Sequence, residues 1–424
     1  MTSERETDIG PLSATGQENV SAPRVERRRE LDLIRVFIVV GLIFFHTARI
    51  FDPQPWYVKN DQTSDLVYIA LGFAATWAMP LLFFVAGMGI WYSLRSRSLA
   101  VFSLERVRRL AVPLLFGTLV IVPPQVWIRL QGSVDHVEPY WQFLSRFFDI
   151  RFEIASFPII IVSDPATNLF EFAHLWFLLV LFLFTLLLLP VIGILRSDAG
   201  LRLIDRLAGI SGKFWVILAA GLPIGILEAT FPFHSQDGLG GWGRYSYILF
   251  LLYGYLLATD PRNGEAFYKH RVKALLLAIS TFVIVGALFV FGSERPGANM
   301  MQDNDLLSLS MRVVRGTSGL LWIVAILGYG SGFSRKEQAA RREDRDPTLP
   351  DRVASYMSEA VLPVFVLHQT VIVLLGFYLV QVPVGPIFKY LIICLTSLAA
   401  IFVIYEFAVR RTRLTRFLLG MKLH

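Results

Sequence analysis

Long apolar runs alternate with short polar segments along the whole chain. Ten of these runs approach the ~20 residues that an α-helix needs to cross the ~30 Å hydrocarbon core of a bilayer. The pattern predicts an all-α, polytopic membrane protein with about ten transmembrane helices. The sixth run is short, and the eighth contains two arginines. The runs cover residues 31–51, 66–93, 110–130, 172–195, 213–231, 244–258, 273–292, 306–330, 358–380 and 387–409.

The polar segments between the runs alternate in charge. If the N-terminus is cytoplasmic, six segments lie on the cytoplasmic side, and they hold 28 of the 40 Lys and Arg residues. Cytoplasmic loops close to a membrane carry an excess of Lys and Arg, so this distribution predicts that both termini are cytoplasmic. The six segments are residues 24–30, 93–109, 196–213, 259–273, 331–357 and 410–424.

Composition agrees with a membrane protein. The chain is 54% hydrophobic with a mean hydropathy of +0.55, and only 17% of its residues are charged, against ~25% in soluble domains. Its net charge of +7 fits basic loops near anionic lipid headgroups, so we expect the lipid bilayer and no nucleic acid as a partner. The single cysteine, Cys394, offers neither a disulfide framework nor a cysteine metal site, and we expect no metal.

The runs also suggest how the chain is divided. Residues 1–30 lack the apolar core of a signal peptide and are expected to form a disordered cytoplasmic tail. Residues 31–409 form the membrane domain, with an outer loop at 131–171 and an inner charged loop at 331–357, and residues 410–424 form a basic cytoplasmic tail. Within the outer loop, "IASFPIIIV" (154–162) is too short to span, and we expect it to enter the interface or to cover a cavity as a lid.

The first apolar run, "LDLIRVFIVVGLIFFH" (31–46), carries ionisable residues at both ends. Arg35 and His46 are eleven residues apart, which is about three helical turns, so they share one face about 16 Å apart. Asp32 lies one turn before Arg35 and can pair with it. At these positions Arg35 can bind phosphate in a bidentate way, and a neutral, buried His46 can act as a general base. The alternative is that Asp32 and Arg35 snorkel to the interface and His46 bonds to a neighbouring helix.

Five motifs in order resemble the acyltransferase 3 family of integral membrane acyltransferases, which includes O-antigen acetylases and periplasmic glucan succinyltransferases. The first is the R-x10-H spacing of Arg35 and His46, preceded by "LD". The second is "MPLLFFVAGMGIWYSLRSRS" (79–98), where the apolar run is expected to end in a glycine turn. The third is the F-x3-R-x2-R-x3-P element of Phe102, Arg106, Arg109 and Pro113. The last two are "HLWFLLVLF" (174–182) and "VLHQTVIVLLGFY" (366–378), so the resemblance covers nearly the whole chain.

The resemblance implies a multi-pass enzyme of the inner (plasma) membrane that is acyl-CoA-dependent and transfers groups other than amino-acyl groups. It implies transfer of an acetyl or succinyl group from cytoplasmic acyl-CoA to a hydroxyl of an outer-face glycan or glycolipid. Acyl-CoA is then a donor substrate, no cofactor is bound permanently, and a homo-oligomer is compatible with the sequence. His46 would be the catalytic base, and Arg35, Arg106 and Arg109 would bind the CoA phosphates. The basic "RVRR" segment (106–109) is also what topology alone requires.

Other buried polar residues are candidates for the acceptor site. His174 is expected at the outer face near the depth of His46, where it would bind the acceptor, orient the base, or belong to an aromatic belt. Arg49 shares a face with His46 and would contact the acceptor or the interface. His368, beside Gln369, would either bind substrate or form an interhelix hydrogen bond. An ion pair among Arg312, Arg315 and Glu228 would shape an acceptor cavity, with Arg315 as the binding candidate.

Two functions from other classes remain alternatives. A transporter would use the same buried polar residues as a substrate or proton path, although no repeated pair of broken helices is visible in the sequence. A membrane scaffold would use them only for helix packing, and would tolerate replacement of His46. "GLGGWG" (238–243) follows no strand and is not expected to bind phosphate, and no nucleophile elbow or Walker motif is present.

Overall fold

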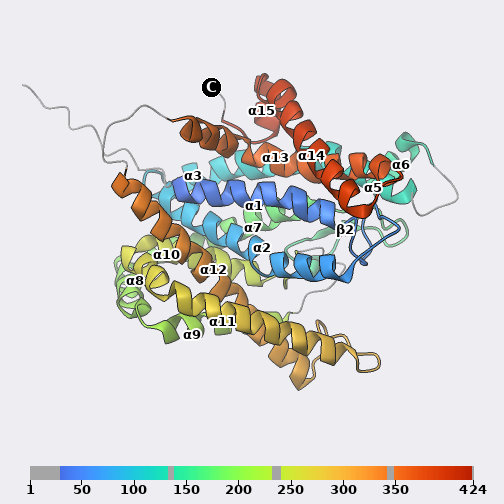
Figure 1. Ribbon diagram of the computed structural model, residues 1–424. Coiled ribbons are helices and arrows are strands. Elements are labelled where there is room, and N and C mark those ends of the chain that lie inside the picture. The colour runs from blue at the N-terminus through green and yellow to red at the C-terminus, as the bar shows by residue number, and fades with distance from the viewer. Residues whose placement is uncertain (1–28, 132–137, 232–239, 341–347, 423–424) are drawn as a thin grey trace, which may run out of the picture.

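The computed structural model describes residues 29–131, 138–231, 240–340 and 348–422, with the side chains of 29–30 and 333–340 left undescribed (Figure 1). The tail expected at 1–30 therefore lies almost wholly outside the described residues. Parts of the loops expected at 131–171 and 331–357, and the end of the tail expected at 410–424, also lie outside them.

The described chain is almost entirely helical. Its α-helices are α1 (Arg29–Ala48), α2 (Asp65–Leu94), α3 (Leu99–Arg106), α4 (Val112–Phe116), α5 (Pro123–Gln131), α6 (Tyr140–Phe147), α7 (Trp176–Leu195), α8 (Asp198–Ser211), α9 (Phe214–Thr230), α10 (Ser246–Thr259), α11 (Pro261–Ser293), α12 (Leu306–Ala340), α13 (Leu349–Leu379), α14 (Pro386–Ile404) and α15 (Arg413–Leu418). Two strands, β1 (Ile150–Phe152) and β2 (Ile161–Ser163), pair antiparallel, with Ile150 opposite Ser163.

Eight helical segments of the described chain are long and apolar enough to cross a membrane. They are Leu31–Ala48, Asp65–Leu94, Leu99–Gln131, Ala173–Leu195, Pro261–Ser293, Leu306–Gly332, Leu349–Leu379 and Pro386–Val409. The count rises to nine if α8 and α9, which are bent by 119°, form one span, and α10 is a shorter apolar helix of 14 residues. The expected all-α, polytopic membrane protein is confirmed, and the fifth and sixth expected helices are the two that fall short as separate spans.

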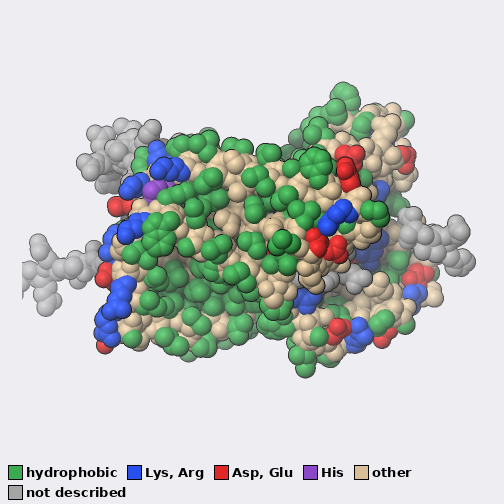
Figure 2. All heavy atoms as spheres, turned by 90° about the horizontal axis from the view of Figure 1, so that it is seen from below, with side chains coloured by type: hydrophobic (Ala, Val, Ile, Leu, Met, Phe, Trp, Pro, Cys, Tyr) green, Lys and Arg blue, Asp and Glu red, His purple; other side chains and the backbone are tan. Residues whose placement is uncertain are grey.

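The two ends of the helix bundle differ in their charged side chains. Lys and Arg side chains gather at the end shown at the left of Figure 2, which is where α1 begins and α8 lies in Figure 1. Hydrophobic side chains cover most of the middle, and basic and acidic side chains are mixed at the other end. We call the two ends the basic end and the opposite end.

Helix α2 lies at the centre of the bundle and contacts α1, α10 and α12. Helix α12 in turn packs against α9 and α11, while α1 packs against α13, which contacts α5 and α14. The middle of α2 is fully buried, with Phe83 and Val85 at 0% exposure. Because α1 lies between α2 and α13, its polar residues face the interior of the protein.

Gly87 of α2 and Gly254 of α10 allow the two helices to pack closely, and Gly87 lies where the sequence suggested a turn. The helix continues through Gly87 and Gly89 to Leu94, so the expected glycine turn is wrong. A Cβ at Gly87 would lie 1.9 Å from the carbonyl oxygen of Leu251 on α10, and a Cβ at Gly254 would lie 1.8 Å from that of Phe84. Small residues at these positions let the backbones of α2 and α10 meet, as is common between membrane helices.

The third span is not a uniform α-helix. Two π-helical turns, Val107–Ala111 and Gly117–Ile121, alternate with α3, α4 and α5. The first π turn begins directly after Arg106, so Arg109 lies in a different helical geometry from Arg106. Wide turns of this kind are rare in proteins as a whole, but where they occur they are often at functional sites.

The outer loop expected at 131–171 has structure of its own in its described part. It contains α6 and the β1–β2 hairpin, which includes the apolar stretch expected at 154–162. Arg244 donates hydrogen bonds to the carbonyls of Ala155 and Phe157, and the ring of Phe157 stacks on Tyr245. Ile154 is 84% exposed. The hairpin is therefore attached to the segment before α10 on one side and presents apolar side chains on the other.

Candidate active site

Three histidines from distant parts of the chain form one cluster. His46 lies near the end of α1, His174 lies in the short 3-10 turn Ala173–Leu175 before α7, and His368 lies in the middle of α13. The ring centroid of His368 is 5.1 Å from that of His46 and 4.9 Å from that of His174. The structure thus brings together the candidate base and two of the candidate acceptor residues.

Hydrogen bonds fix the tautomers of two of these rings. His174 Nε2 is 2.9 Å from the carbonyl oxygen of Val366, and His368 Nδ1 is 2.6 Å from that of Phe365. A carbonyl oxygen only accepts, so each of these nitrogens carries the hydrogen. His174 Nδ1 and His368 Nε2 remain as acceptors, and both are buried without a partner among the described residues. The bond of His368 stays within α13, where an interhelix bond was one of the two expectations.

His46 is the partly exposed member of the cluster. Its Nδ1 is buried and has no partner among the described residues, so this side of the ring faces the protein. The ring stacks on Trp56, with centroids 6.0 Å apart and planes 14° from parallel. The accessible side of the ring therefore carries Nε2, the nitrogen that a substrate can reach.

The turn into His174 has an unusual backbone. Ala173 has a φ of 47°, in the left-handed region that residues other than glycine rarely adopt. Such a residue costs of order 1–3 kcal/mol and persists where the surroundings fix it. The turn starts α7 directly after His174, and the adjoining Leu175 is fully buried.

The loop after α1 is held by a charge cluster that includes Arg49. Arg49 and Lys59 both pair with the fully buried carboxylate of Asp52, and Arg49 also donates to the carbonyl of Pro55. Burial lowers the pKa of Lys59, and its bonds to Asp52 oppose that shift. Arg49 and Asp52 precede Trp56 in the chain, and Lys59 follows it. The cluster therefore fixes both sides of the loop and holds the Trp56 indole over His46. An acceptor contact of Arg49 stays a prediction.

A buried amide layer lies next to the histidines. Gln369 donates to Gln125 Oε1 at 2.8 Å, and Gln125 donates to the hydroxyl of Thr370 at 2.7 Å. The Thr370 hydroxyl in turn donates to the carbonyl of Ile121 at 2.8 Å. Gln369 directly follows His368, so this layer fixes α13 against the third span at the level of the cluster. Only Gln369 had been noticed from the sequence.

A second polar group, formed by Tyr57, Arg129 and Glu171, was missed entirely. The Tyr57 hydroxyl and Arg129 Nη1 both donate to the carboxylate of Glu171, the latter at 3.0 Å, and the Arg129 guanidinium lies over the Tyr57 ring. Burial and the neighbouring Glu171 raise the pKa of Tyr57 well above its ordinary value. Tyr57 adjoins Trp56 and lies close to Gln369, so the group borders the cluster. Its members lie in loops and at a helix end, where no periodic pattern marks them.

Arg35 lies near the basic end of α1, as expected. Its guanidinium pairs with Asp32 at 3.2 Å and donates to the carbonyl of Val85 on α2, also at 3.2 Å. A Cβ at Gly89 would lie 2.7 Å from Arg35 Nη2. The missing side chain of Gly89 therefore makes the space that the guanidinium occupies.

Arg106 and Arg109 lie near Arg35. Arg106 covers the ring of Phe102 at 4.8 Å and makes no ion pair with a described residue, while the charges of Arg35 and Arg109 are close enough to act on it. Arg109 pairs with Glu105 at 3.1 Å. The structure thus gathers the three arginines at the basic end.

Arg315 and Glu228 form the buried ion pair that the sequence suggested, at 2.5 Å. Glu228 also accepts hydrogen bonds from the Ser246 hydroxyl and from the backbone N–H of Gly243. The Arg315 guanidinium donates to the carbonyl of Gly241 and lies 4.4 Å from the ring centroid of Trp242. The described part of "GLGGWG" is thereby fixed against α9 and α12, and binding of substrate by Arg315 stays a prediction.

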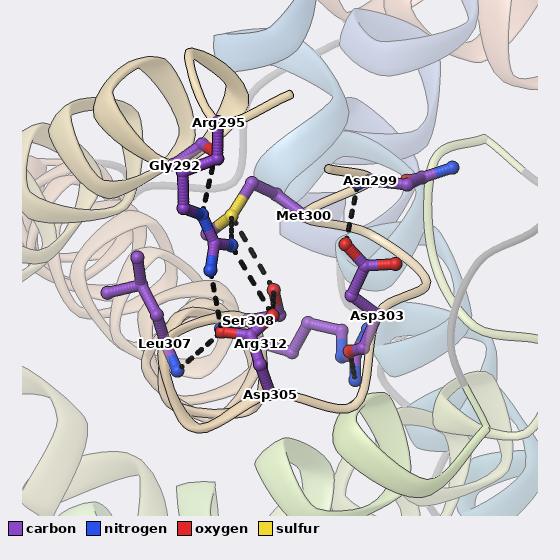
Figure 3. A network of polar contacts seen from close by, with 9 residues as sticks. All are labelled: Gly292, Arg295, Asn299, Met300, Asp303, Asp305, Leu307, Ser308 and Arg312. Atoms are coloured by element: carbon purple, nitrogen blue, oxygen red, sulfur yellow. Dashed lines mark hydrogen bonds and ion pairs between the residues drawn. The ribbon is translucent and has the colours of Figure 1, made fainter. Parts of the chain in front are cut away.

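Arg312 does not join that pair. It donates to the carbonyl of Asp303 at 2.7 Å and to that of Ala229 at 3.4 Å, beneath the loop that leads into α12 (Figure 3). Next to it, Asp305 pairs with Arg295 and accepts from Ser308, and these bonds hold the pKa of Asp305 below its ordinary value (Figure 3). Arg312 therefore stabilises a loop at the opposite end.

Among the described residues, no group of three or more His, Cys, Asp or Glu is placed to hold a metal ion.

The fold and the site define a multi-pass membrane protein with arginines at the basic end and buried histidines at the opposite end of the same helix. Residues 28–406 match the acyltransferase 3 family, described as an acyltransferase domain, and the chain belongs to this family. The protein is therefore a membrane acyltransferase. Its family membership favours this class over a transporter or a scaffold. No curated protein and no solved structure matches the chain.

Proposed function

We propose that the protein transfers an acetyl or succinyl group from acyl-CoA at the basic end to a hydroxyl of a glycan or glycolipid at the opposite end. The observation that carries this proposal is the arrangement of α1, whose first turns hold Arg35 in the arginine group and whose last turn holds His46 in the histidine cluster. Membership in an acyltransferase family supports the reaction class.

The arginine group would bind the donor. Phosphates of CoA carry several negative charges, and a guanidinium binds phosphate through two parallel hydrogen bonds. Arg106 has no ion pair with a described residue, and Arg35 and Arg109 are partly exposed although each pairs with a carboxylate. The group therefore presents three guanidinium groups at one place. The thioester would extend along α1 toward His46, over the about 16 Å that separate positions 35 and 46 of a helix.

His46 would be the catalytic residue. Its Nε2 takes the proton of the acceptor hydroxyl as the oxygen attacks the thioester carbonyl, which forms the ester bond and breaks the carbon–sulfur bond. The leaving thiolate of CoA receives that proton from His46, so the imidazole is neutral again at the end of the cycle. No covalent enzyme intermediate is needed, and the buried surroundings exclude water that would hydrolyse the thioester.

The acceptor would bind beside Trp56, Tyr57 and Glu171. An indole face and a carboxylate with a neighbouring phenol offer the stacking and hydrogen-bonding groups that a sugar ring uses, and they border the accessible side of His46. His174 Nδ1, an acceptor without a partner among the described residues, adds a site for a hydroxyl group.

Turnover with purified protein tests this function. Full-length protein in lipid nanodiscs is given acetyl-CoA or succinyl-CoA and a panel of oligosaccharides and glycolipids, and acceptor-dependent CoA release is measured. His46→Ala is expected to lower kcat by 10²-fold or more, as for removal of a general base. The matched control is His270→Gln, because His270 is also a buried histidine bonded to a carbonyl, that of Gly212, but lies near the basic end of α11. Undiminished turnover by His46→Ala would contradict the proposal.

A further inference from the structure

A cavity of about 230 Å³ lies among the helices at the basic end. Its lining comes from α8, α9, α10, α11 and α12, and from Phe84 of α2. None of the three arginines of the proposed donor site and none of the clustered histidines is part of that lining. The cavity opens on one side, where Leu207 of α8 is 41% exposed. An apolar cavity of about 150 Å³ holds a benzene molecule, so this one has room for a larger apolar group.

The lining is polar at the start of α11, which contacts α8, and apolar deeper in the bundle. At the polar end, Thr259 Oγ1 and Asn263 Nδ2 both donate to the carbonyl of Leu256, at 2.6 and 3.0 Å. Tyr253 lies six residues before Thr259 on α10, about 9 Å deeper. Twelve of the sixteen lining residues are apolar, and Phe84 among them is only 1% exposed. A molecule that fits is therefore polar at one end and apolar over about 10 Å.

Helix α8 has the features of a helix that lies at the membrane surface. It is bent by 119° from α9 and so does not continue that span. Its buried Ile204 lines the cavity, while Leu201, Leu203 and Ile210 are 38–49% exposed. Amphipathic helices with such exposed apolar residues lie at the boundary between headgroups and acyl chains. The cavity therefore opens to lipid, and an acyl chain that fills it gains the dispersion contacts that an empty apolar space lacks.

Two cations adjoin residues that line the cavity. Arg206 and Lys213 are exposed, and neither makes an ion pair with a described residue. Arg206 directly precedes Leu207, and Lys213 comes two residues after Ser211, both of which line the cavity. Basic pockets between membrane helices bind the phosphate of lipid headgroups, and the cytoplasmic leaflet carries anionic lipids. The two charges thus complement a phosphate at the polar end of the cavity.

We propose that the cavity binds one acyl chain of an anionic phospholipid from the leaflet at the basic end, with the lipid phosphate on Arg206 and Lys213. An acetyl or succinyl donor has no long chain, and a glycolipid acceptor would bind at the opposite end, so neither is the occupant. The bound chain contacts Phe84, whose backbone packs against Gly254 in the α2–α10 contact. The lipid therefore supports the packing of α10 against α2. This inference does not depend on the proposed function.

Photolabelling in nanodiscs tests the site. Full-length protein is placed in phosphatidylcholine nanodiscs with a trace of phosphatidylglycerol that carries a diazirine in one acyl chain, and the labelled peptides are identified by mass spectrometry. We expect label on the lining residues of α9 and α10. Ala220→Phe, which fills the cavity from α9, should lower this label about tenfold or more. The matched control is Ala219→Phe, because Ala219 is exposed on the same helix and does not line the cavity. Equal labelling of the two variants would overturn the proposal.

Competition between headgroups gives a second readout, on variants altered only at the surface. Unlabelled phosphatidylglycerol should compete with the label about tenfold better than phosphatidylcholine with the same chains. The double variant Arg206→Gln/Lys213→Gln should lose most of this preference, while Arg411→Gln/Arg413→Gln, which removes two exposed cations of the C-terminal segment, should keep it. Equal competition by the two lipids would overturn the proposal, and so would stronger competition by palmitoyl-CoA, which would assign the cavity to an acyl donor. Neither readout involves turnover, so inactivity toward glycans would contradict the proposed function alone.

Discussion

Gly89 shows how much can depend on one missing side chain. Arg35, Asp32 and His46 were all found from the sequence, because ionisable residues in an apolar run are conspicuous. The role of Gly89 was not found, since nothing in a helical pattern shows which glycine faces a guanidinium. Tyr57, Arg129 and Glu171 were missed for a related reason: they meet only through the path of the loops, and a loop has no period. Local spacing on one helix could be predicted, and contacts between loops could not.

Gly89→Ala should displace the guanidinium of Arg35 with little effect on stability. The new methyl group would lie 2.7 Å from Arg35 Nη2, the mobile end of a long side chain, so the side chain moves and the helix stays. We expect the KM for acyl-CoA to rise about three- to tenfold with kcat nearly unchanged, in the range of one lost charge-assisted hydrogen bond. Gly72→Ala on the same helix, with no atom within 4 Å, is the control and should leave KM unchanged. Equal KM values for both variants would contradict a donor role for Arg35.

Ala173→Gly should raise the thermal stability. Glycine adopts a positive φ without steric cost, so the change should relieve about 1 kcal/mol of backbone strain before His174. The measurement is the midpoint of thermal unfolding in detergent, compared with wild type. A lower midpoint would show that the Ala173 methyl group contributes packing that exceeds the strain.

Helix pairing at the element scale is governed by residues that a hydropathy pattern does not distinguish. Each of the eight candidate spans of the described chain lies on an expected apolar run, while two further runs fall short as separate spans. The pattern could not show that α2 continues through Gly87 and Gly89, or that α10 meets it there. Nor could it show the π turns that separate Arg106 from Arg109, because wide and normal turns have similar composition. Helices α8 and α9 meet at a 119° bend that a hydropathy pattern does not specify.

Gly87→Ala and Gly254→Ala should each destabilise the α2–α10 pair. The added methyl groups would lie 1.9 Å and 1.8 Å from backbone carbonyl oxygens of the other helix, and backbone cannot move aside as a side chain can. We expect a loss of about 1–3 kcal/mol, the usual range for overpacking, seen as a lower unfolding midpoint. Gly264→Ala on α11, with no atom within 4 Å, serves as the control. A midpoint equal to that of the control would show that the two helices separate without cost.

At the scale of the whole molecule, the chain joins a basic end and a histidine cluster through one continuous helix. The counts of Lys and Arg predicted this polarity from the sequence, and the gathering of basic side chains at one end agrees with it (Figure 2). Family membership fixes the reaction class. In the proposed function the donor binds at the basic end and the base lies at the other end, so the direction of transfer across the bilayer is the property that a sided assay tests.

The most direct measurement uses membrane vesicles of known orientation from cells that express the protein. Radiolabelled acetyl-CoA or succinyl-CoA, which does not cross the bilayer, is added to inside-out and to right-side-out vesicles, and label in the saccharide and glycolipid fraction is counted. We expect label only in inside-out vesicles with wild-type protein, and at least 10²-fold less with His46→Ala. Equal labelling of right-side-out vesicles, or undiminished labelling by His46→Ala, would contradict transfer from the basic end through His46.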